Sequence, residues 1–133
     1  MLRPILSALL ALVAGALGIS LVQGLNFLLF PPPPGLDFND PVQLEAIMAQ
    51  MHLGAMLMVE LSYALGCLLA GAVVGRLAGP RRMAVAGVVG LLFTLAGFAN
   101  MASVPTPLWL AVLTTVTYMP ACLGGAWLAR LRG

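Results

Sequence analysis

One acidic residue, Glu60, stands alone inside a long apolar stretch of the chain. A carboxyl group within a membrane-spanning segment costs on the order of a few kcal/mol to insert, so it normally faces other helices or a water-filled cavity. Glu60 could therefore carry a proton or a cation in a ligand or ion site. The alternative is a protonated Glu60 that hydrogen-bonds Gln23 or a threonine and holds two helices together. The sequence leaves both alternatives open.

Further polar side chains are expected at a similar depth in the membrane. A helix rises about 1.5 Å per residue, so residues equally far from the outer ends of their helices share a depth. Tyr63 follows Glu60 by about one helical turn and lies on the same face. These residues together predict a polar layer that forms a small outward-facing ligand or ion site. Its members are Glu60, Gln23, Tyr63, Thr114, Thr115 and Tyr118.

A candidate metal site lies near the start of the second apolar run. Met48, His52 and Met56 are spaced i, i+4, i+8, which places them on one face of a continuous helix. Thioether and imidazole groups suit a soft ion such as Cu(I), although methionine is also common apolar packing. A single histidine offers no bis-histidine pair for haem. We predict no cofactor.

Catalytic motifs are absent from the sequence. The chain contains no G-x-S-x-G, H-E-x-x-H, C-x-x-C or Walker glycine loop. Its basic residues are six arginines scattered over short segments, whereas nucleic-acid binding needs a basic patch. The sequence therefore predicts neither an enzyme nor a nucleic-acid-binding protein.

The composition identifies the class of protein that carries these residues. Of 133 residues, 62% are hydrophobic and 8% are charged, against about 25% charged in a soluble domain. So few charges cannot cover a water-soluble globule, and a disordered chain needs low hydrophobicity. We therefore expect one polytopic membrane domain over residues 1–133. Cys67 and Cys122 lie in apolar runs and are expected to be unpaired.

Three apolar runs provide four membrane spans. The third run, residues 83–129, has no charged residue and would form a helix of about 70 Å, more than twice the hydrocarbon core. Pro105 and Pro107 break this run. The fold is therefore predicted to be an all-α, antiparallel up-down four-helix bundle. The expected elements are spans at about 4–30, 53–75, 83–101 and 108–129, with an amphipathic lead-in from Pro41 to His52 capped by Asp40.

Small residues mark the expected helix contacts. Gly71 and Gly75 form a G-x-x-x-G motif, which allows two helix backbones to approach closely in a membrane. The motif packs either within the bundle or against a second copy of the chain. The full set of expected packing positions is Gly66, Gly71, Gly75, Ala121 and Gly125.

The arginines define an orientation in the membrane. In a four-span topology all six fall on one side, which the positive-inside rule places in the cytoplasm together with both termini. Asp37, Asp40 and Glu45 fall on the opposite side. Trp109 and Trp127 bracket the last span, as is typical of interfacial tryptophans.

Two outer-loop motifs carry a resemblance to a known group of proteins. Residues 31–37 read PPPPGLD, and residues 100–109 end in a P-x-P-L-W motif. With Leu53-Gly54-Ala55 and the glycine-rich end of the second span, they resemble a widespread family of small uncharacterised bacterial four-helix integral membrane proteins. Relatives often carry histidine where this chain has Thr106. The resemblance covers nearly the whole chain and implies a multi-pass protein of the bacterial inner membrane, without implying an activity.

We therefore expect a small inner-membrane protein that serves as a non-catalytic subunit or interaction protein. Its expected partners are the lipid bilayer and either a homodimer or a larger membrane complex. The alternative function is that of a small transporter or channel-like binder of a ligand or ion. That alternative would use Glu60 together with Gln23, Tyr63, Thr114 and Thr115.

Overall fold

The computed structural model describes residues 2–31, 35, 40–50, 52–103 and 106–131. Four of the described helices are long and apolar enough to cross a membrane. The predicted all-α four-helix fold is confirmed, and the expected spans agree with the observed helices to within a few residues. The elements are α1 (Leu2–Leu29), α2 (Pro41–Gln50), α3 (Leu53–Leu77), a 3-10 turn (Gly79–Arg81), α4 (Arg82–Ser103) and α5 (Leu108–Leu131).

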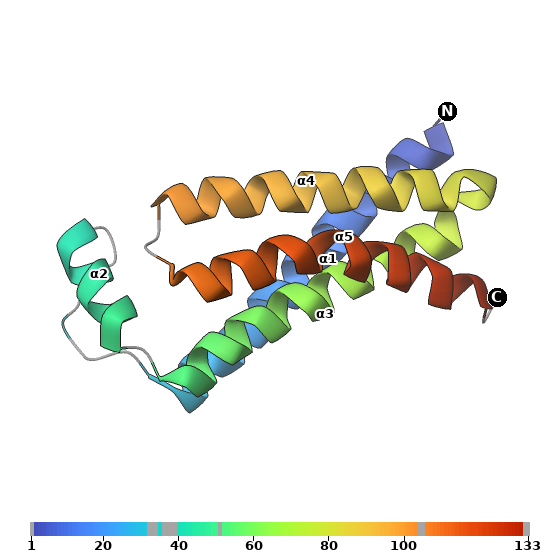
Figure 1. Cartoon of the computed structure of the whole chain (residues 1–133). Coiled ribbons are helices and arrows are strands. Elements are labelled where there is room, and N and C mark those ends of the chain that lie inside the picture. The colour runs from blue at the N-terminus through green and yellow to red at the C-terminus, as the bar shows by residue number, and fades with distance from the viewer. Residues whose placement is uncertain (1, 32–34, 36–39, 51, 104–105, 132–133) are drawn as a thin grey trace.

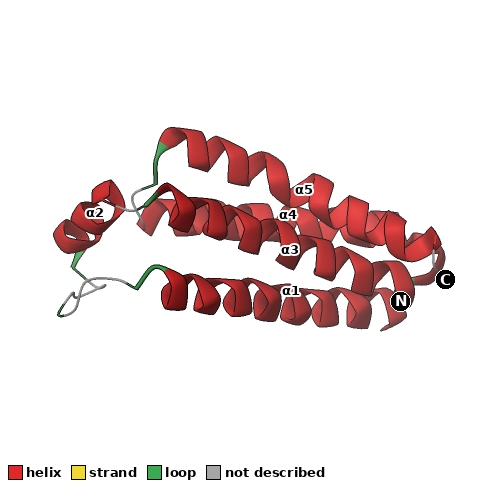
Figure 2. Ribbon diagram, turned by 90° about the horizontal axis from the view of Figure 1, so that it is seen from below, coloured by secondary structure: helices red, strands yellow, loops and turns green. Residues whose placement is uncertain are grey.

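The four long helices run up and down between two ends of the bundle (Figure 1). α1 begins and α5 ends at one end, which we call the arginine end, and α2 lies beyond the other, the α2 end. α3 packs most extensively against α5 and α1, and α4 packs mainly against α5. Figure 2 shows α3 between α1 and α5. The second and fourth spans, which run parallel, therefore form the centre of the bundle.

Glycines bring the backbones of α3 and α5 into contact. A Cβ atom on Gly71 would overlap the carbonyl oxygen of Cys122, and one on Gly125 would overlap that of Leu68. At Gly75 the same atom would lie 2.5 Å from the carbonyl oxygen of Ala126. Dispersion over such a close approach is a main source of helix association in lipid. Glycine at these positions therefore determines how α3 and α5 fit together.

α1 is attached to α3 along one narrow stripe. Gly15 and Gly66 face each other, because a Cβ atom on Gly66 would lie 2.8 Å from the carbonyl oxygen of Gly15. At the arginine end, Arg3 Nε donates to the carbonyl oxygen of Leu77 at 2.7 Å. Carbonyls at a helix C-terminus lack partners within the helix, and a cation satisfies them well. Arg3 thus joins the start of α1 to the end of α3.

The two halves of the bundle differ in packing. Toward the α2 end, the α1–α3 pair diverges from the α4–α5 pair (Figure 1). Most fully buried side chains, such as Val74 and Val89, lie in the half near the arginine end. The bundle is therefore tightly packed at the arginine end and more open at the α2 end.

The lead-in helix begins as predicted and ends earlier. Asp40 Oδ1 accepts from the backbone N–H of Val42 at 3.0 Å, which confirms the predicted cap. The expected continuation to His52 is wrong, because α2 ends at Gln50 and His52 is the N-cap of α3. The imidazole accepts the N–H of the second residue of α3, so it starts a new helix instead of extending the previous one.

Adjacent glycines of α5 provide a test of this packing. We expect Gly125→Ala to lower the free energy of unfolding by about 1–3 kcal/mol, since its methyl group would overlap the α3 backbone. Gly124→Ala is the matched control, because nothing lies within 4 Å of its Cβ position, and it should remain within about 0.5 kcal/mol of wild type. Unfolding by SDS in mixed detergent micelles measures both variants. Equal stability of the two would contradict the close approach of α3 and α5.

Candidate functional site

Glu60 lies on α3, partly buried and directed toward α5. Its Oε1 atom lies 2.5 Å from the Thr117 hydroxyl, at hydrogen-bonding distance. Its Oε2 atom is buried and has no hydrogen-bond partner among the described residues. The carboxyl group is thus anchored by one oxygen, and the other is an unused acceptor.

Tyr63 lies one turn deeper and connects three other helices. Its ring packs against the ring of Tyr118 on α5, with centroids 5.5 Å apart. Its hydroxyl accepts from Asn100 Nδ2 on α4 at 3.4 Å and lies within hydrogen-bonding reach of Gln23 on α1. Gly97 on α4 leaves space for the Tyr118 ring, because a Cβ there would lie 2.6 Å from the Tyr118 hydroxyl.

Amide side chains of α1 complete the polar layer on the other face of α3. Gln23 Nε2 donates to Ser62 Oγ at 3.3 Å, and Asn26 Nδ2 donates to the carbonyl oxygen of Ala55 at 3.2 Å. The Asn26 Oδ1 atom is a second buried acceptor without a partner among the described residues. All four long helices therefore contribute polar side chains near the α2 end.

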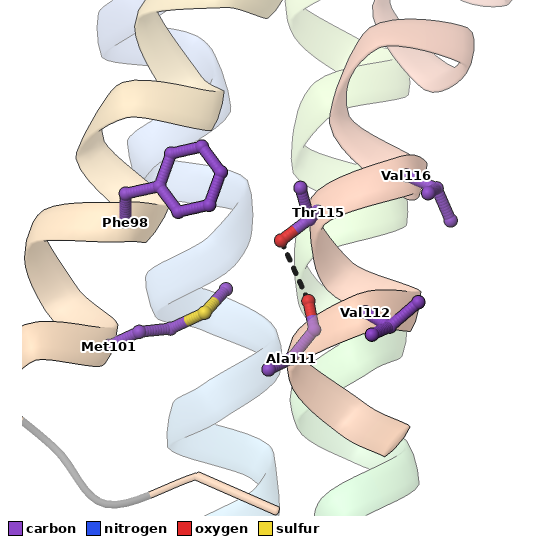
Figure 3. Close-up of a pocket in the computed structure, with 6 residues that line it drawn as sticks. All are labelled: Phe98, Met101, Ala111, Val112, Thr115 and Val116. Carbon is purple, nitrogen blue, oxygen red and sulfur yellow. Dashed lines mark hydrogen bonds between the residues drawn. The ribbon is translucent and has the colours of Figure 1, made fainter. Parts of the chain in front are cut away.

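Thr114 and Thr115 make no hydrogen bond to this layer among the described contacts. Thr114 is buried and donates to the carbonyl oxygen of Ala111 at 3.1 Å, and Thr115 donates to the same oxygen at 2.7 Å. Thr115 instead lines an apolar groove between α4 and α5, with a volume of about 310 Å³ (Figure 3). The groove is lined by Phe98, Met101, Ala111, Val112, Thr115 and Val116.

The threonine that contacts Glu60 is Thr117. Depth along the helix predicted Thr114 and Thr115 instead. Ser62 and Asn100 also contribute hydrogen bonds that the sequence did not assign to the site. The only sequence signal for Thr117 is a hydroxyl in the same span as Thr114. Which threonine faces α3 depends on the rotation of α5 about its axis, and that rotation is decided by the glycine contacts.

The helix that was predicted to carry the candidate metal site is interrupted. The prediction required Met48, His52 and Met56 on one helical face, but they belong to two helices with His52 at the junction. His52 Nδ1 accepts the N–H of Gly54 at 3.0 Å, and its ring stacks on Phe30. Within the described residues no group of three His, Cys, Asp or Glu side chains could hold a metal ion.

The two cysteines face each other below the tyrosines. Cys67 and Cys122 are buried and form no disulfide, as predicted, and their thiols lie close enough to interact. Three pairs therefore follow one another between α3 and α5 toward the arginine end. They are Glu60 with Thr117, Tyr63 with Tyr118, and Cys67 with Cys122. The backbone contact at Gly71 comes next and closes this column.

Comparison with known proteins gives no relative from which a function could be inferred. No family model, no curated protein and no solved structure matches the chain. The resemblance to small four-helix bacterial membrane proteins therefore stays a prediction.

Substitutions of Glu60 test how the carboxyl group stabilises the bundle. We expect Glu60→Ala to lower the free energy of unfolding by about 0.6–2 kcal/mol, because an interhelical hydrogen bond is lost. Glu60→Gln should retain most of the stability, since its side-chain amide can still form a hydrogen bond with Thr117. Thr115→Val is the control, because its hydroxyl bonds only within α5 among the described contacts. A Glu60→Ala variant as stable as wild type would contradict the contact with Thr117.

Proposed function

We propose that this protein is a small multi-pass membrane protein that binds a small ligand or ion at Glu60. The observation that carries this proposal is the buried Oε2 atom without a partner among the described residues. An unsatisfied buried acceptor costs about 1–3 kcal/mol. Native proteins rarely retain such an atom unless a water, ion or ligand completes it.

The surroundings of Glu60 support binding from the α2 end. The helix pairs diverge in that direction (Figure 1), and Glu60 and Asn100 both remain partly exposed. In the opposite direction the glycine contacts of α3 with α5 leave no space for a side chain. The helices are thus in backbone contact on the arginine side of Glu60 and diverge on its α2 side, which favours entry of a ligand from the α2 end.

The distribution of charge supports an orientation in which the site faces outward. The 3-10 turn and both bundle termini carry arginines at the arginine end, while Asp40 and Glu45 lie at the α2 end. Because positive residues favour the cytoplasmic side, we place both termini in the cytoplasm and the site toward the outside. The bacterial inner membrane is the location that the family resemblance favours.

The second candidate function is a non-catalytic subunit, and the exposure of α1 favours it. Among its described residues, α1 buries only Ser7, Ala11 and Gly15. Most of its leucines, including Leu21 and Leu28, are exposed to whatever surrounds the bundle. Lipid covers such a face, and so would a helix of a second copy or of a larger membrane complex. No arrangement of described side chains supports catalysis, so we propose no enzymatic activity.

Accessibility of Glu60 to water tests the binding site. We expect Glu60→Cys to react with a charged, membrane-impermeant methanethiosulfonate reagent. The matched control is Leu61→Cys. Leu61 is 46% exposed on the apolar surface of the same span, which faces lipid in the membrane, so a charged reagent should not reach this cysteine. The native cysteines give no background, since both are 0% exposed. An unreactive Glu60→Cys would overturn the proposal of an aqueous site.

Labelling from one side of the membrane tests the orientation. In intact spheroplasts, Glu45→Cys should react with an impermeant maleimide, and Arg81→Cys should react only after the membrane is opened. Both positions are exposed, so a difference reports the side of the membrane. The reverse pattern would place the termini outside and contradict the orientation.

A further inference from the structure

The contacts of Thr117 determine where the proton of the Glu60 site lies. Thr117 Oγ1 lies 2.7 Å from the carbonyl oxygen of Leu113 and 2.5 Å from Glu60 Oε1. A threonine hydroxyl has one proton to donate, and the Leu113 carbonyl has none. When the hydroxyl donates to Leu113, as threonines in helices commonly do, the contact with Glu60 needs a proton from the carboxyl group.

We propose that Glu60 is held as a neutral carboxylic acid and that the site exchanges its proton for one organic ammonium ion. This inference rests on the proposed function, since it names the class of ligand that the same site binds. In the resting site, the Oε1–H group donates to Thr117, whose hydroxyl donates to the carbonyl oxygen of Leu113. Oε2 is then the free acceptor of the acid and receives an N–H group of the ligand.

The side chains around Glu60 offer no positive charge that would stabilise a carboxylate. The described titratable groups that interact with Glu60 are Tyr63 and Cys67 on α3 and Tyr118 on α5, and phenols and thiols carry no positive charge in either protonation state. The described contacts from α1 and α4 to this layer come from amides. The described arginines lie at the opposite end of the bundle. An unpaired carboxylate in apolar surroundings takes up a proton instead, until another cation replaces that proton.

The ligand that fits is an ammonium ion with an apolar or aromatic group. A hard metal ion needs about six oxygen ligands, most often with several carboxylates among them, and the described residues contain no group of three His, Cys, Asp or Glu side chains that could hold one. An N–H group needs only one good acceptor, which Oε2 provides. The Tyr63 and Tyr118 rings lie within electrostatic reach of Glu60, and aromatic rings attract ammonium ions by cation–π interaction.

The exchange conserves charge within the membrane. The acid loses its proton, the ammonium ion keeps its own, and the resulting carboxylate–ammonium pair carries no net charge. The released proton leaves toward the α2 end, because in the opposite direction the backbones of α3 and α5 are in close contact at Gly71, Gly75 and Gly125. One positive charge enters the site for each proton that leaves.

The experiment uses the full-length protein in detergent and three probes of one shape. Benzylammonium carries a charge and N–H donors, benzyltrimethylammonium carries a charge without donors, and benzyl alcohol carries a donor without charge. Binding is measured by calorimetry, and proton release by an indicator dye in weakly buffered solution. Infrared difference spectroscopy follows the C=O stretch of a protonated carboxylic acid.

We expect benzylammonium to bind, to release one proton per molecule bound and to bleach the acid C=O band. Benzyltrimethylammonium should bind more weakly, and benzyl alcohol should release no proton. Glu60→Gln should lack the band, release no proton and bind benzylammonium at least about tenfold more weakly, since a charge-assisted hydrogen bond is lost. Thr115→Val, the matched control, should behave as wild type.

Each result separates this inference from the proposed function. Benzylammonium binding without proton release, or without an acid band, overturns the proton exchange and leaves a ligand site at Glu60. Benzyl alcohol binding as tightly as benzylammonium overturns the ammonium class. An acid band without binding of any probe overturns the exchange as well, and with an unreactive Glu60→Cys it also removes the proposed function. If Glu60→Gln does not fold, the proton release, the acid band and the comparison of the three probes can still be measured on the wild-type protein alone.

Discussion

The backbone contact between α3 and α5 is the interaction on which the rest of the bundle depends. Lipid tails are as apolar as leucine, so side-chain hydrophobicity does little to select one helix pairing over another in a membrane. Close approach at Gly71, Gly75 and Gly125 does select the pairing of α3 with α5, because any larger residue would hold the two backbones apart. This contact makes the second and fourth spans the central pair, and α1 and α4 are placed around them.

The same contact brings the polar groups into register. With the glycines of two parallel helices in contact, residues one to three turns nearer the α2 end must face each other as well. Cys67 meets Cys122, Tyr63 meets Tyr118, and Glu60 meets a threonine hydroxyl. Toward the α2 end the helix pairs diverge, so Glu60 lies where the close packing of α3 against α5 ends.

An isolated acid in such a place has few stable states. A carboxylate without a counter-ion is unfavourable in apolar surroundings, whereas a protonated acid or a carboxylate–cation pair is neutral overall. The arginines that could have neutralised Glu60 are instead concentrated at the other end, where Arg3 and Arg82 satisfy carbonyl oxygens near the end of α3. Structural and ligand-binding roles of Glu60 are therefore compatible, since the proton that bonds Glu60 to Thr117 in the empty site is the one that a cation would replace.

Properties that depend on local sequence could be predicted from the sequence alone. Span lengths, the break near Pro105 and Pro107, the Asp40 cap and the shared face of Glu60 and Tyr63 follow from hydropathy and helical period, which neighbouring residues determine. The choice of Thr117 over Thr114 and Thr115, and the pairing of α3 with α5, required the tertiary structure. Depth along a helix is a local quantity, but the rotation of a helix about its axis is decided by the surface it packs against. The interruption at His52 likewise depended on its contacts with Gly54 and Phe30, which the spacing of Met48, His52 and Met56 does not reveal.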